Sequence, residues 1–302
     1  DFAPTIYTLL AYHLKFDLER KAWCNRDRLV VSAGHASALL YASLFYCLDE
    51  FSIEELKKYR RISSSLGGHP EYNLNNRIEA TTGLLGQGFA TAVGLAIGEK
   101  YLESTFNRKK NTIFDYNIYC ICSDGDLMEG ITYEAASLAG TLELDNLIVL
   151  YDSNAVTADG DIEKTSVEDI EARFSSINWE VIRVKKGESV KEISNAIDKA
   201  KKSSRPVLIE VETVLGIYSK YEGTNRIHAN LEKEDLEEIR SELKCKEAFT
   251  FDEEVRNNLL TFIKEGTEDN DTTVFFEFPS GTQDQLYAMH YNDPVTLNLS
   301  LK

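Results

Sequence analysis

The sequence has little positive charge: 33 Lys and Arg residues stand against 50 Asp and Glu residues, which gives a formal net charge of −17. A protein that binds nucleic acid through the phosphate backbone needs a basic surface that displaces counterions. The composition therefore disfavours nucleic acid as a partner. Any anion that the protein binds must be held by local geometry.

Long apolar runs are also missing, because none reaches the roughly 18 residues that a membrane helix requires. No membrane association is expected. The chain has five cysteines, an odd number, and no two of them form a C-x-x-C motif. A chain of this length does not depend on disulfides for its stability. This favours a reducing, cytoplasmic location. The chain lacks an initial Met and a basic leader, which suggests that translation does not begin at residue 1.

Four apolar runs rich in β-branched residues recur in this chain of 302 residues, at 117–123, 146–152, 179–184 and 206–213. Runs without polar alternation are typical of strands buried on both faces, as in a parallel sheet. Helical stretches lie between them. The pattern therefore predicts an α/β fold with a doubly wound, mostly parallel sheet and helices on both faces.

Helical periodicity marks the segments between these strands, and helices are also predicted at residues 37–50 and 86–102. An apolar stripe is the face that an amphipathic helix turns toward the core. The segments 130–144 and 189–203 each carry such a stripe, formed respectively by Ile131, Ala135, Leu138 and Leu142 and by Val190, Ile193, Ile197 and Ala200.

Two polar residues end consecutive predicted strands 30 positions apart: Asp124 in "CSDGDLMEG" and Asn154 in "YDSNAV". In an open parallel sheet, ligands bind beyond the carboxyl ends of the strands, so both side chains are expected side by side at that edge. A carboxylate, an amide oxygen and a backbone carbonyl supply half of an octahedral Mg²⁺ shell, and a diphosphate with water can complete it. The spacing therefore predicts a metal-held diphosphate.

The residues around Asp124 favour the same interpretation. Gly125 lets a phosphate approach the backbone without a Cβ in the way. A helix predicted to begin near residues 129–131 points its N-terminal amides at the anion. Taken singly, Asp-Gly is a common turn and a loop Asn often forms an Asx-turn. Both together, at the ends of consecutive strands, favour the metal site.

A fingerprint with this spacing is known from thiamine diphosphate enzymes, and here it is "SDGD" followed by "YDSN", with Ser123 and Ser153 replacing a more usual Gly and Asn. Further motifs are "AGHAS", "GGHPE", "TTGLLGQG" and "GTNRIHAN". In order and spacing, residues 26–243 resemble the diphosphate-binding half of a transketolase.

The resemblance implies site residues for thiamine diphosphate and for Mg²⁺ or Ca²⁺. The metal ligands would be the side chains of Asp124 and Asn154 and the carbonyl of Val156. Glu129 would pair across a dimer and link two cofactor sites, although a carboxylate at a helix N-terminus also has a purely structural use. The implied cofactor contacts are His35, Gly83, Leu84 (where the family usually has Pro), Leu85, Gly125, Glu129, Asn154 and His228.

Three histidines in matched motifs, His35, His69 and His228, are implied to line the substrate channel, with His69 and His228 as catalytic residues. An imidazole with a pKa near neutrality can donate a proton to a developing alkoxide and take it back. His13 and His290 match no motif and are expected to be surface residues.

The resemblance implies the transketolase reaction of the pentose phosphate pathway, in which a two-carbon ketol unit passes reversibly from a ketose phosphate to an aldose phosphate. Related alternatives are dihydroxyacetone synthase, deoxyxylulose phosphate synthase and a catalytically silent cofactor-binding fragment. In this family a pyrimidine-binding domain completes the site, and the residues after Leu243 are too few to contain it. We therefore expect a homodimer or a partner chain that carries that domain, and no activity without it.

The composition changes near the end of this resemblance. Two charged helices are predicted at residues 233–243 and 252–266, and a polar linker follows. The predicted organisation is a diphosphate- and metal-binding domain at residues 1–245, a charged helical extension at 246–266, and a tail at 267–302 without an assigned function.

Overall fold

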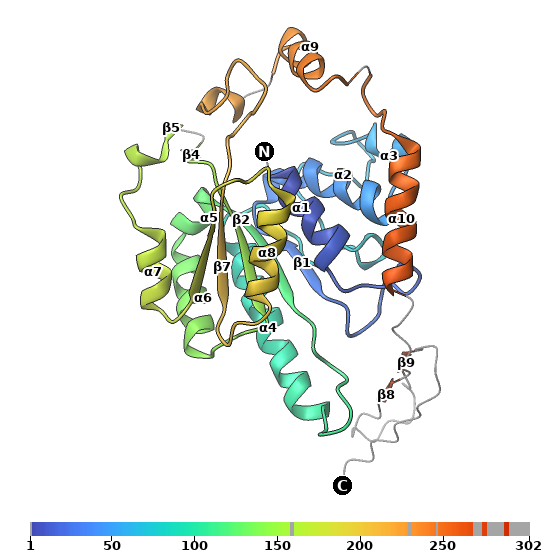
Figure 1. The fold of residues 1–302 in the computed structure, drawn as a ribbon, viewed down its shortest axis with the longest axis vertical. Helices are drawn as coiled ribbons and strands as arrows, with labels where there is room; N and C mark the ends of the chain where they lie inside the picture. The colour runs from blue at the N-terminus through green and yellow to red at the C-terminus, as the bar shows by residue number, and fades with distance from the viewer. Residues whose placement is uncertain are drawn as a thin grey trace.

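A five-stranded parallel sheet forms the centre of the protein (Figure 1). The computed structural model describes residues 2–157, 160–228, 231–245, 247–267, 274–276 and 287–289. The strand order is β1-β2-β3-β7-β6, and every neighbouring pair is parallel. The strands are β1 (Arg28–Val31), β2 (Ile118–Ser123), β3 (Leu147–Ser153), β6 (Glu180–Val184) and β7 (Val207–Glu212).

The four strands expected from the apolar runs are confirmed, and β1 joins them at the edge beside β2. Alternate side chains enter two separate cores because successive residues of a strand point to opposite faces. Ile121 and Leu150 belong to one core, whereas Cys122 and Val149 belong to the other. Cys120 and Cys122 are both completely buried, and none of the five cysteines forms a disulfide.

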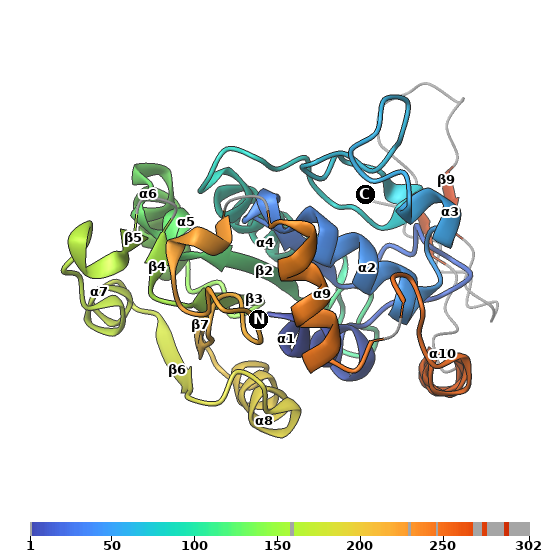
Figure 2. The same ribbon diagram turned by 90° about the horizontal axis from the view of Figure 1, so that it is seen from above.

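Helices cover both faces of the sheet, as predicted, and Figure 2 shows them on its two sides. One face carries α4 and α6, with Phe174 of α7. The other face carries α1, its π-helical extension η1, α2, α8 and α10. These helices are α1 (Ala3–Thr8), η1 (Leu9–His13), α2 (Ser37–Leu48), α4 (Gln87–Phe106), α6 (Gly130–Thr141), α7 (Ile170–Ser176), α8 (Val190–Ala200) and α10 (Glu253–Thr267).

Shorter elements connect this framework or lie beyond it. A short antiparallel pair, β4 with β5, follows β3, and a second pair is formed by β8 and β9. The remaining elements are α3 (Ile53–Leu56), α5 (Asp124–Met128), α9 (Lys233–Glu242), β4 (Val156–Thr157), β5 (Gly160–Asp161), β8 (Val274–Phe276), β9 (Tyr287–Met289), and the 3-10 turns η2 (Gly34–Ala36), η3 (Leu74–Asn76), η4 (Ile162–Lys164) and η5 (Asn225–His228). Within the described residues, no helix combines the length and apolarity needed to cross a membrane.

The predicted inner stripe of α6 is wrong at Leu138 and Leu142, whereas Ala135 packs half-buried against the core. Leu138 and Leu142 are 47% and 48% exposed, and the buried residues of α6 are Thr132, Ala136, Ala139 and Gly140. Small residues face inward because the backbones approach closely. A Cβ on Gly140 would lie 1.7 Å from the carbonyl oxygen of Ile177, so no larger side chain fits and the leucines turn outward.

The expectation that His13 is a surface residue is also wrong. Its side chain is buried between η1 and α8, where Nε2 lies 2.8 Å from the hydroxyl oxygen of Ser194. Burial lowers the pKa of His13 to about 4, and the positive charge of Lys201 adds to this effect. The imidazole is therefore neutral near pH 7 and joins the two helices. His290 lies outside the described residues.

The charged helix α10 packs against α2, where Leu259 and Ile263 enter the same core as the first helices. Arg256 adds a hydrogen bond of 2.7 Å to the carbonyl oxygen of Phe45 and an ion pair with Asp49. Because this helix shares a core with the sheet, residues 253–263 are structurally continuous with it. The predicted domain boundary near residue 245 stays a prediction, and most of the tail at 267–302 lies outside the described residues.

Glu99 of α4 is a buried carboxyl group whose ionisation makes the stability of the folded protein depend on pH. Its Oε2 accepts a hydrogen bond of 2.7 Å from the side-chain amide of Asn146, whose own Oδ1 has no hydrogen-bond partner among the described residues. Burial raises the pKa of Glu99 from 4.5 to about 7, although the adjacent Lys100 lowers it in part. Ionised Glu99 therefore destabilises the folded protein.

We expect Glu99→Gln to stabilise the protein above pH 7 by roughly 2–3 kcal/mol and to have little effect below pH 4.5. The unfolded chain ionises this group near pH 4.5 and the folded protein near pH 7, so the stability of the unaltered protein falls as the pH rises through this window. Urea denaturation followed by tryptophan fluorescence at about pH 5 and about pH 8 measures the difference. Glu134→Gln, at an exposed position of α6, is the control; an unchanged pH dependence in Glu99→Gln would contradict the expectation.

Candidate functional site

The carboxyl ends of the parallel strands bring the predicted site residues to one edge of the sheet. Ser123 at the end of β2 is in register with Asp152, and Ser153 at the end of β3 is in register with Glu212 of β7. Asp124 and Asn154 each follow directly after these strand ends. The structure thus places both where the spacing predicted.

A cavity of about 1010 Å³ opens at this edge. Of the predicted site residues, it is lined by His35, Leu85, Asp124, Gly125, Glu129, Asn154, Val156 and His228. Of the Lys and Arg side chains in the described part of the chain, only Arg60 lines it, whereas three carboxylates do: Asp124, Glu129 and Asp152. An anion in this cavity would therefore find little positive charge from lysine or arginine.

Asp124 is buried, and only one of its two carboxylate oxygens accepts a hydrogen bond among the described residues. Its Oδ1 accepts a hydrogen bond from the hydroxyl group of Tyr151, whereas its Oδ2 is buried and has no hydrogen-bond partner among the described residues. Burial raises the pKa of Asp124; the hydrogen bond from Tyr151 and the nearby backbone N–H groups of Asn154 and Ala155 oppose this only in part. A buried carboxylate oxygen without a donor is costly unless a cation contacts it.

Asn154 forms a turn with the residues that follow it. The backbone N–H of Val156 donates to Oδ1 of Asn154 at 3.1 Å, and Nδ2 of Asn154 donates to Oδ2 of Asp152 at 3.4 Å. These bonds fix which side of the amide carries the oxygen. An amide oxygen has two lone pairs, so the one hydrogen bond from Val156 leaves capacity for a metal.

The donor set fits a divalent cation. A buried carboxylate oxygen without a partner, an amide oxygen and a backbone carbonyl are hard oxygen ligands of the type that Mg²⁺ and Ca²⁺ prefer. Among the residues that the structure describes, including this edge of the sheet, no group of three His, Cys, Asp or Glu side chains could hold a metal ion, so a cation here would depend on amide and carbonyl oxygens beside a single carboxylate.

The three predicted histidines lie in one neighbourhood. His35 lies in η2, directly after β1, and His228 ends η5. The side chain of His35 is exposed to solvent at one side. Partial desolvation by the neighbouring atoms lowers the pKa of His35; Asp126 opposes this shift, while His228 and His69 lower the pKa further. His35 and His228 line the cavity, whereas His69 does not. His69 instead packs beside Gly83, where an added Cβ would lie 3.4 Å from its ring.

The loop from Gly83 to Leu85 divides into parts with different surroundings. Gly83 packs against Gly34, where a Cβ would lie 2.8 Å from the backbone nitrogen of Gly83. Leu84 is 78% exposed and does not line the cavity, whereas Leu85 does. A Cβ on Gly125 would lie 2.9 Å from Cδ1 of Leu85. A side chain at position 125 would therefore displace the end of the Leu85 side chain, whether or not a phosphate also approaches Gly125.

Two helices, rather than one, follow β2. The predicted helix near residues 129–131 is α6, which begins at Gly130, but the short helix α5 begins at Asp124 itself. Glu129 lies between them with its side chain exposed, and its carbonyl oxygen accepts the first hydrogen bond of α6 from Thr132, at 3.1 Å. The exposed side chain of Glu129 faces solvent within this chain.

Sequence reasoning missed Asp126, which is completely buried and accepts four hydrogen bonds. Its Oδ1 accepts from the hydroxyl group of Ser32 at 2.5 Å and from the backbone N–H of Gly86 at 2.8 Å. Its Oδ2 accepts from the backbone N–H and the hydroxyl group of Ser123, both at 3.0 Å. The signal was present, because Ser123 and Asp126 have the spacing of a helix capping box.

Tyr151 was missed as well, and the sequence contains no signal that pairs this tyrosine with Asp124. It is buried on the same side of the sheet as Cys122, its register partner in β2. Only the register of β2 against β3 brings its hydroxyl group to the first residue after β2.

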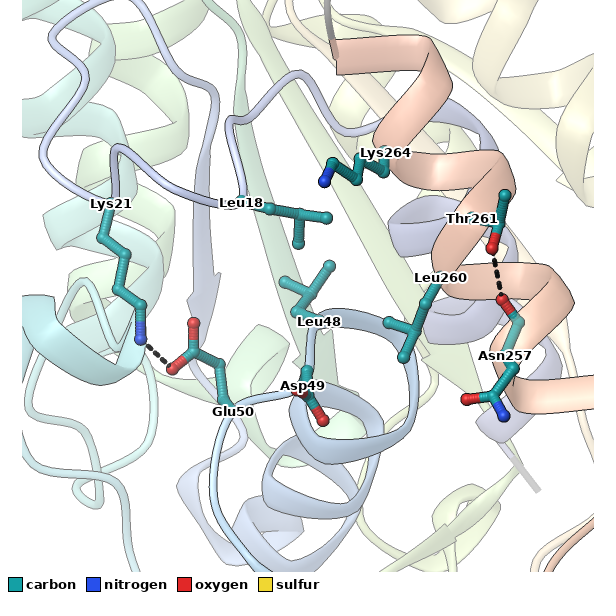
Figure 3. A pocket seen from close by; sticks show the side chains of 9 residues that line it. All are labelled: Leu18, Lys21, Leu48, Asp49, Glu50, Asn257, Leu260, Thr261 and Lys264. Atoms are coloured by element: carbon teal, nitrogen blue, oxygen red, sulfur yellow. Dashed lines mark hydrogen bonds and ion pairs between the residues drawn. The ribbon is translucent and has the colours of Figure 1, made fainter. Parts of the chain in front are cut away.

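A second cavity, of about 500 Å³, lies between α10, the end of α2 and residues 18–21 (Figure 3). Leu18, Leu48 and Leu260 point toward one another across it. Lys21 pairs with Glu50 at its side, at 2.5 Å. None of the predicted site residues lines this cavity.

Comparison with known families gives one match, covering residues 1–278: the family model described as transketolase, thiamine diphosphate binding domain. Among curated proteins, the transketolase of Bacillus subtilis (strain 168) is 48% identical over 236 residues, which are 77% of this chain and 35% of that protein. The transketolase of Staphylococcus aureus (strain MRSA252) is 43% identical over 88% of this chain and 41% of its own length.

Solved structures give the same result. A transketolase from Leishmania mexicana superimposes with a TM-score of 0.83 at 33% identity, over 89% of this chain and 45% of that chain. A transketolase from Pichia stipitis, in complex with sedoheptulose-7-phosphate, superimposes with a TM-score of 0.79 at 33% identity, over 88% of this chain and 44% of that chain. The chain thus spans less than half the length of these relatives.

We expect Asp126→Asn to destabilise the protein by about 2–4 kcal/mol. In asparagine an NH₂ group replaces one of the two carboxylate oxygens, each of which accepts two hydrogen bonds in Asp126. Two of the four bonds are therefore lost, and the two donors that made them face the NH₂ group, which is itself a donor. Urea denaturation at neutral pH measures the change. Glu55→Gln in the exposed capping box of α3 is the control; a loss in Asp126→Asn no larger than in this control would contradict the role of Asp126.

Proposed function

The chain belongs to the transketolase family, and from this premise we propose that it holds thiamine diphosphate at the carboxyl edge of its sheet through a divalent metal bound by Asp124, Asn154 and the carbonyl of Val156. The observation that carries the proposal is that Asp124 lines the cavity while its Oδ2 is buried without a hydrogen-bond partner among the described residues. A divalent cation is a suitable partner for this atom and for a diphosphate.

The charge of the cavity supports a metal rather than a basic cluster. Arg60 is the only Lys or Arg that lines it in the described chain, against the carboxylates of Asp124, Glu129 and Asp152. A diphosphate without a cation would meet net repulsion there. The same feature explains how a protein with a net charge of −17 can hold an anionic cofactor.

We propose transketolase activity for the complete protein: transfer of a two-carbon ketol unit between a ketose phosphate and an aldose phosphate, as in the pentose phosphate pathway. Thiamine diphosphate, when bound, supplies the reactive carbon for cleaving and re-forming the carbon–carbon bond. His69 and His228 would be the catalytic residues, and with His35 they would hold and move protons at the sugar oxygens; His35 and His228 line the cavity, and His69 packs beside Gly83. A phosphorylated sugar is supported as substrate by the sedoheptulose-7-phosphate that the Pichia stipitis relative holds.

A complementary pyrimidine-binding portion is part of this proposal, because the chain covers 35–45% of the relatives described above. A cytoplasmic location is proposed with it. Its support is that the five cysteines, four of them buried, form no disulfide.

We also propose that the protein forms a homodimer through the outer face of α6. Leu138 and Leu142 are exposed there, one helical turn apart, and Tyr101 of the neighbouring helix α4 is 67% exposed. Exposed apolar patches on a soluble protein mark interaction surfaces. Glu129 precedes α6 directly, so this face would bring Glu129 toward the partner, as its proposed pairing across the dimer requires.

Calorimetric titration of thiamine diphosphate into the chain, with and without Mg²⁺, tests the metal site. We expect binding that depends on Mg²⁺ and that Asp124→Ala weakens by roughly 100-fold or more, because a ligand itself is lost. Asp145→Ala, which removes an exposed carboxylate before β3, is the matched control. Equal binding with and without Mg²⁺, or undiminished binding by Asp124→Ala, would contradict the proposal.

If the chain alone does not bind, the titration is repeated with a pyrimidine-binding domain added. Metal-dependent binding and ketol transfer in the mixture would support the split site. Binding without any transfer would instead favour a catalytically silent fragment.

Sedimentation velocity tests the dimer. We expect the double variant Leu138→Glu, Leu142→Glu to sediment as a monomer at concentrations where the unaltered chain is a dimer, since four charges would be buried in the interface. Val255→Glu, an equally exposed position on α10, is the control and is expected to leave the dimer intact. A dimer that persists in the double variant would exclude this face.

A further inference from the structure

Three carboxylates at the carboxyl edge differ in how their oxygens are satisfied. Both oxygens of Asp126 accept hydrogen bonds. Asp152 likewise has a donor at each oxygen, from the hydroxyl group of Thr213 at 2.5 Å and from Nδ2 of Asn154 at 3.4 Å. Asp124 alone of the three has one oxygen bonded and the other buried without a partner in the described structure.

The bonded oxygen of Asp124 has a single side-chain donor, Tyr151. We propose that Tyr151 is a positioning residue for the metal-binding carboxylate: its hydroxyl group holds Oδ1 of Asp124, so that Oδ2 is presented to a divalent cation. This inference rests on the proposed function, and it assigns Tyr151 a role that none of the predicted site residues has.

The position of Tyr151 follows from strand register. Tyr151 pairs with Cys122 in the parallel ladder of β2 and β3. Asp124 lies two residues after Cys122, on the same side of the chain because side chains alternate with a period of two. A tyrosine side chain is long enough to reach this diagonal neighbour. Shorter polar side chains at this position would not reach the carboxylate.

The ring of Tyr151 is held firmly. It is 2% exposed and belongs to the core that contains Cys122 and Val149. A donor fixed by packing cannot rotate away when a cation approaches the carboxylate, and a hydrogen bond of this kind orients a ligand without contacting the metal. Because a phenol donates one proton, it can satisfy only one of the two carboxylate oxygens.

Tyr119 offers a matched comparison. It lies on the neighbouring strand β2, is completely buried, and its hydroxyl group has no hydrogen-bond partner among the described residues. Its side chain enters the opposite core from that of Tyr151. Removing either hydroxyl group deletes one buried oxygen atom, but only the loss at Tyr151 affects Asp124.

The test measures the affinity for Mn²⁺ in the presence of thiamine diphosphate, by electron paramagnetic resonance of the free ion. We expect Tyr151→Phe to weaken Mn²⁺ binding by about 10-fold to 100-fold, and Tyr119→Phe to change it by less than about twofold. Affinity of Tyr151→Phe within twofold of the unaltered chain, or an equal loss in Tyr119→Phe, would overturn the inference.

Asp124→Ala, measured in the same way, separates this inference from the proposed function. If Asp124→Ala loses Mn²⁺ and Tyr151→Phe retains it, the metal site stands and Tyr151 has no positioning role. If Asp124→Ala retains Mn²⁺, the metal lies elsewhere, and both the proposed metal site at Asp124 and the positioning role of Tyr151 are wrong.

A second measurement does not depend on the folding of a variant. With ¹³C at Cζ of tyrosine, the resonance of Tyr151 is expected to move when Mg²⁺ and the cofactor are added, because the cation withdraws charge from the carboxylate that accepts the hydrogen bond. The resonance of Tyr119 is expected to stay. A Tyr151 resonance that does not move while the metal binds would contradict the inference.

Discussion

The buried carboxylate of Asp126 is the contact on which the edge of the sheet depends. It accepts hydrogen bonds from Ser32 after β1, from the backbone at Gly86 before α4, and from Ser123 at the end of β2. Ser32 in turn accepts from the backbone N–H of Phe89 at 3.0 Å. One charged group therefore holds three segments that lie far apart in the sequence, and the cavity is built on the loops that it fixes.

The three buried carboxylates at this edge differ in how many of their oxygens accept hydrogen bonds. Asp126 and Asp152 have donors at both oxygens and are structurally satisfied, whereas Asp124 leaves one oxygen buried and open. An unsatisfied buried group destabilises the chain on its own and is stabilised by a bound cation. In our proposal, stability lost at Asp124 in the isolated chain is recovered when the metal and the diphosphate bind.

Close packing at small residues shapes both the surroundings of the cavity and the outer surface of α6. Gly88 approaches Ser32 so closely that a Cβ would lie 2.5 Å from its Cα, and Gly140 approaches Ile177 still more closely. Because the inner face of α6 has room only for small side chains, the large apolar residues Leu138 and Leu142 are turned outward. The proposed dimer face is thus a consequence of how tightly α6 packs, and Glu129, which lines the cavity, directly precedes this helix.

The sequence by itself determined the doubly wound sheet and the places of Asp124 and Asn154, because continuous β-branched runs and residues that end strands are local patterns. The capping pair of Ser123 and Asp126 is an equally local pattern, because its two residues are three positions apart. Tertiary structure alone decided the buried face of α6, the burial of His13 and the bond from Tyr151 to Asp124. Each of these depends on the distance between backbones or on the register between strands, and neither quantity is contained in the periodicity of a single segment.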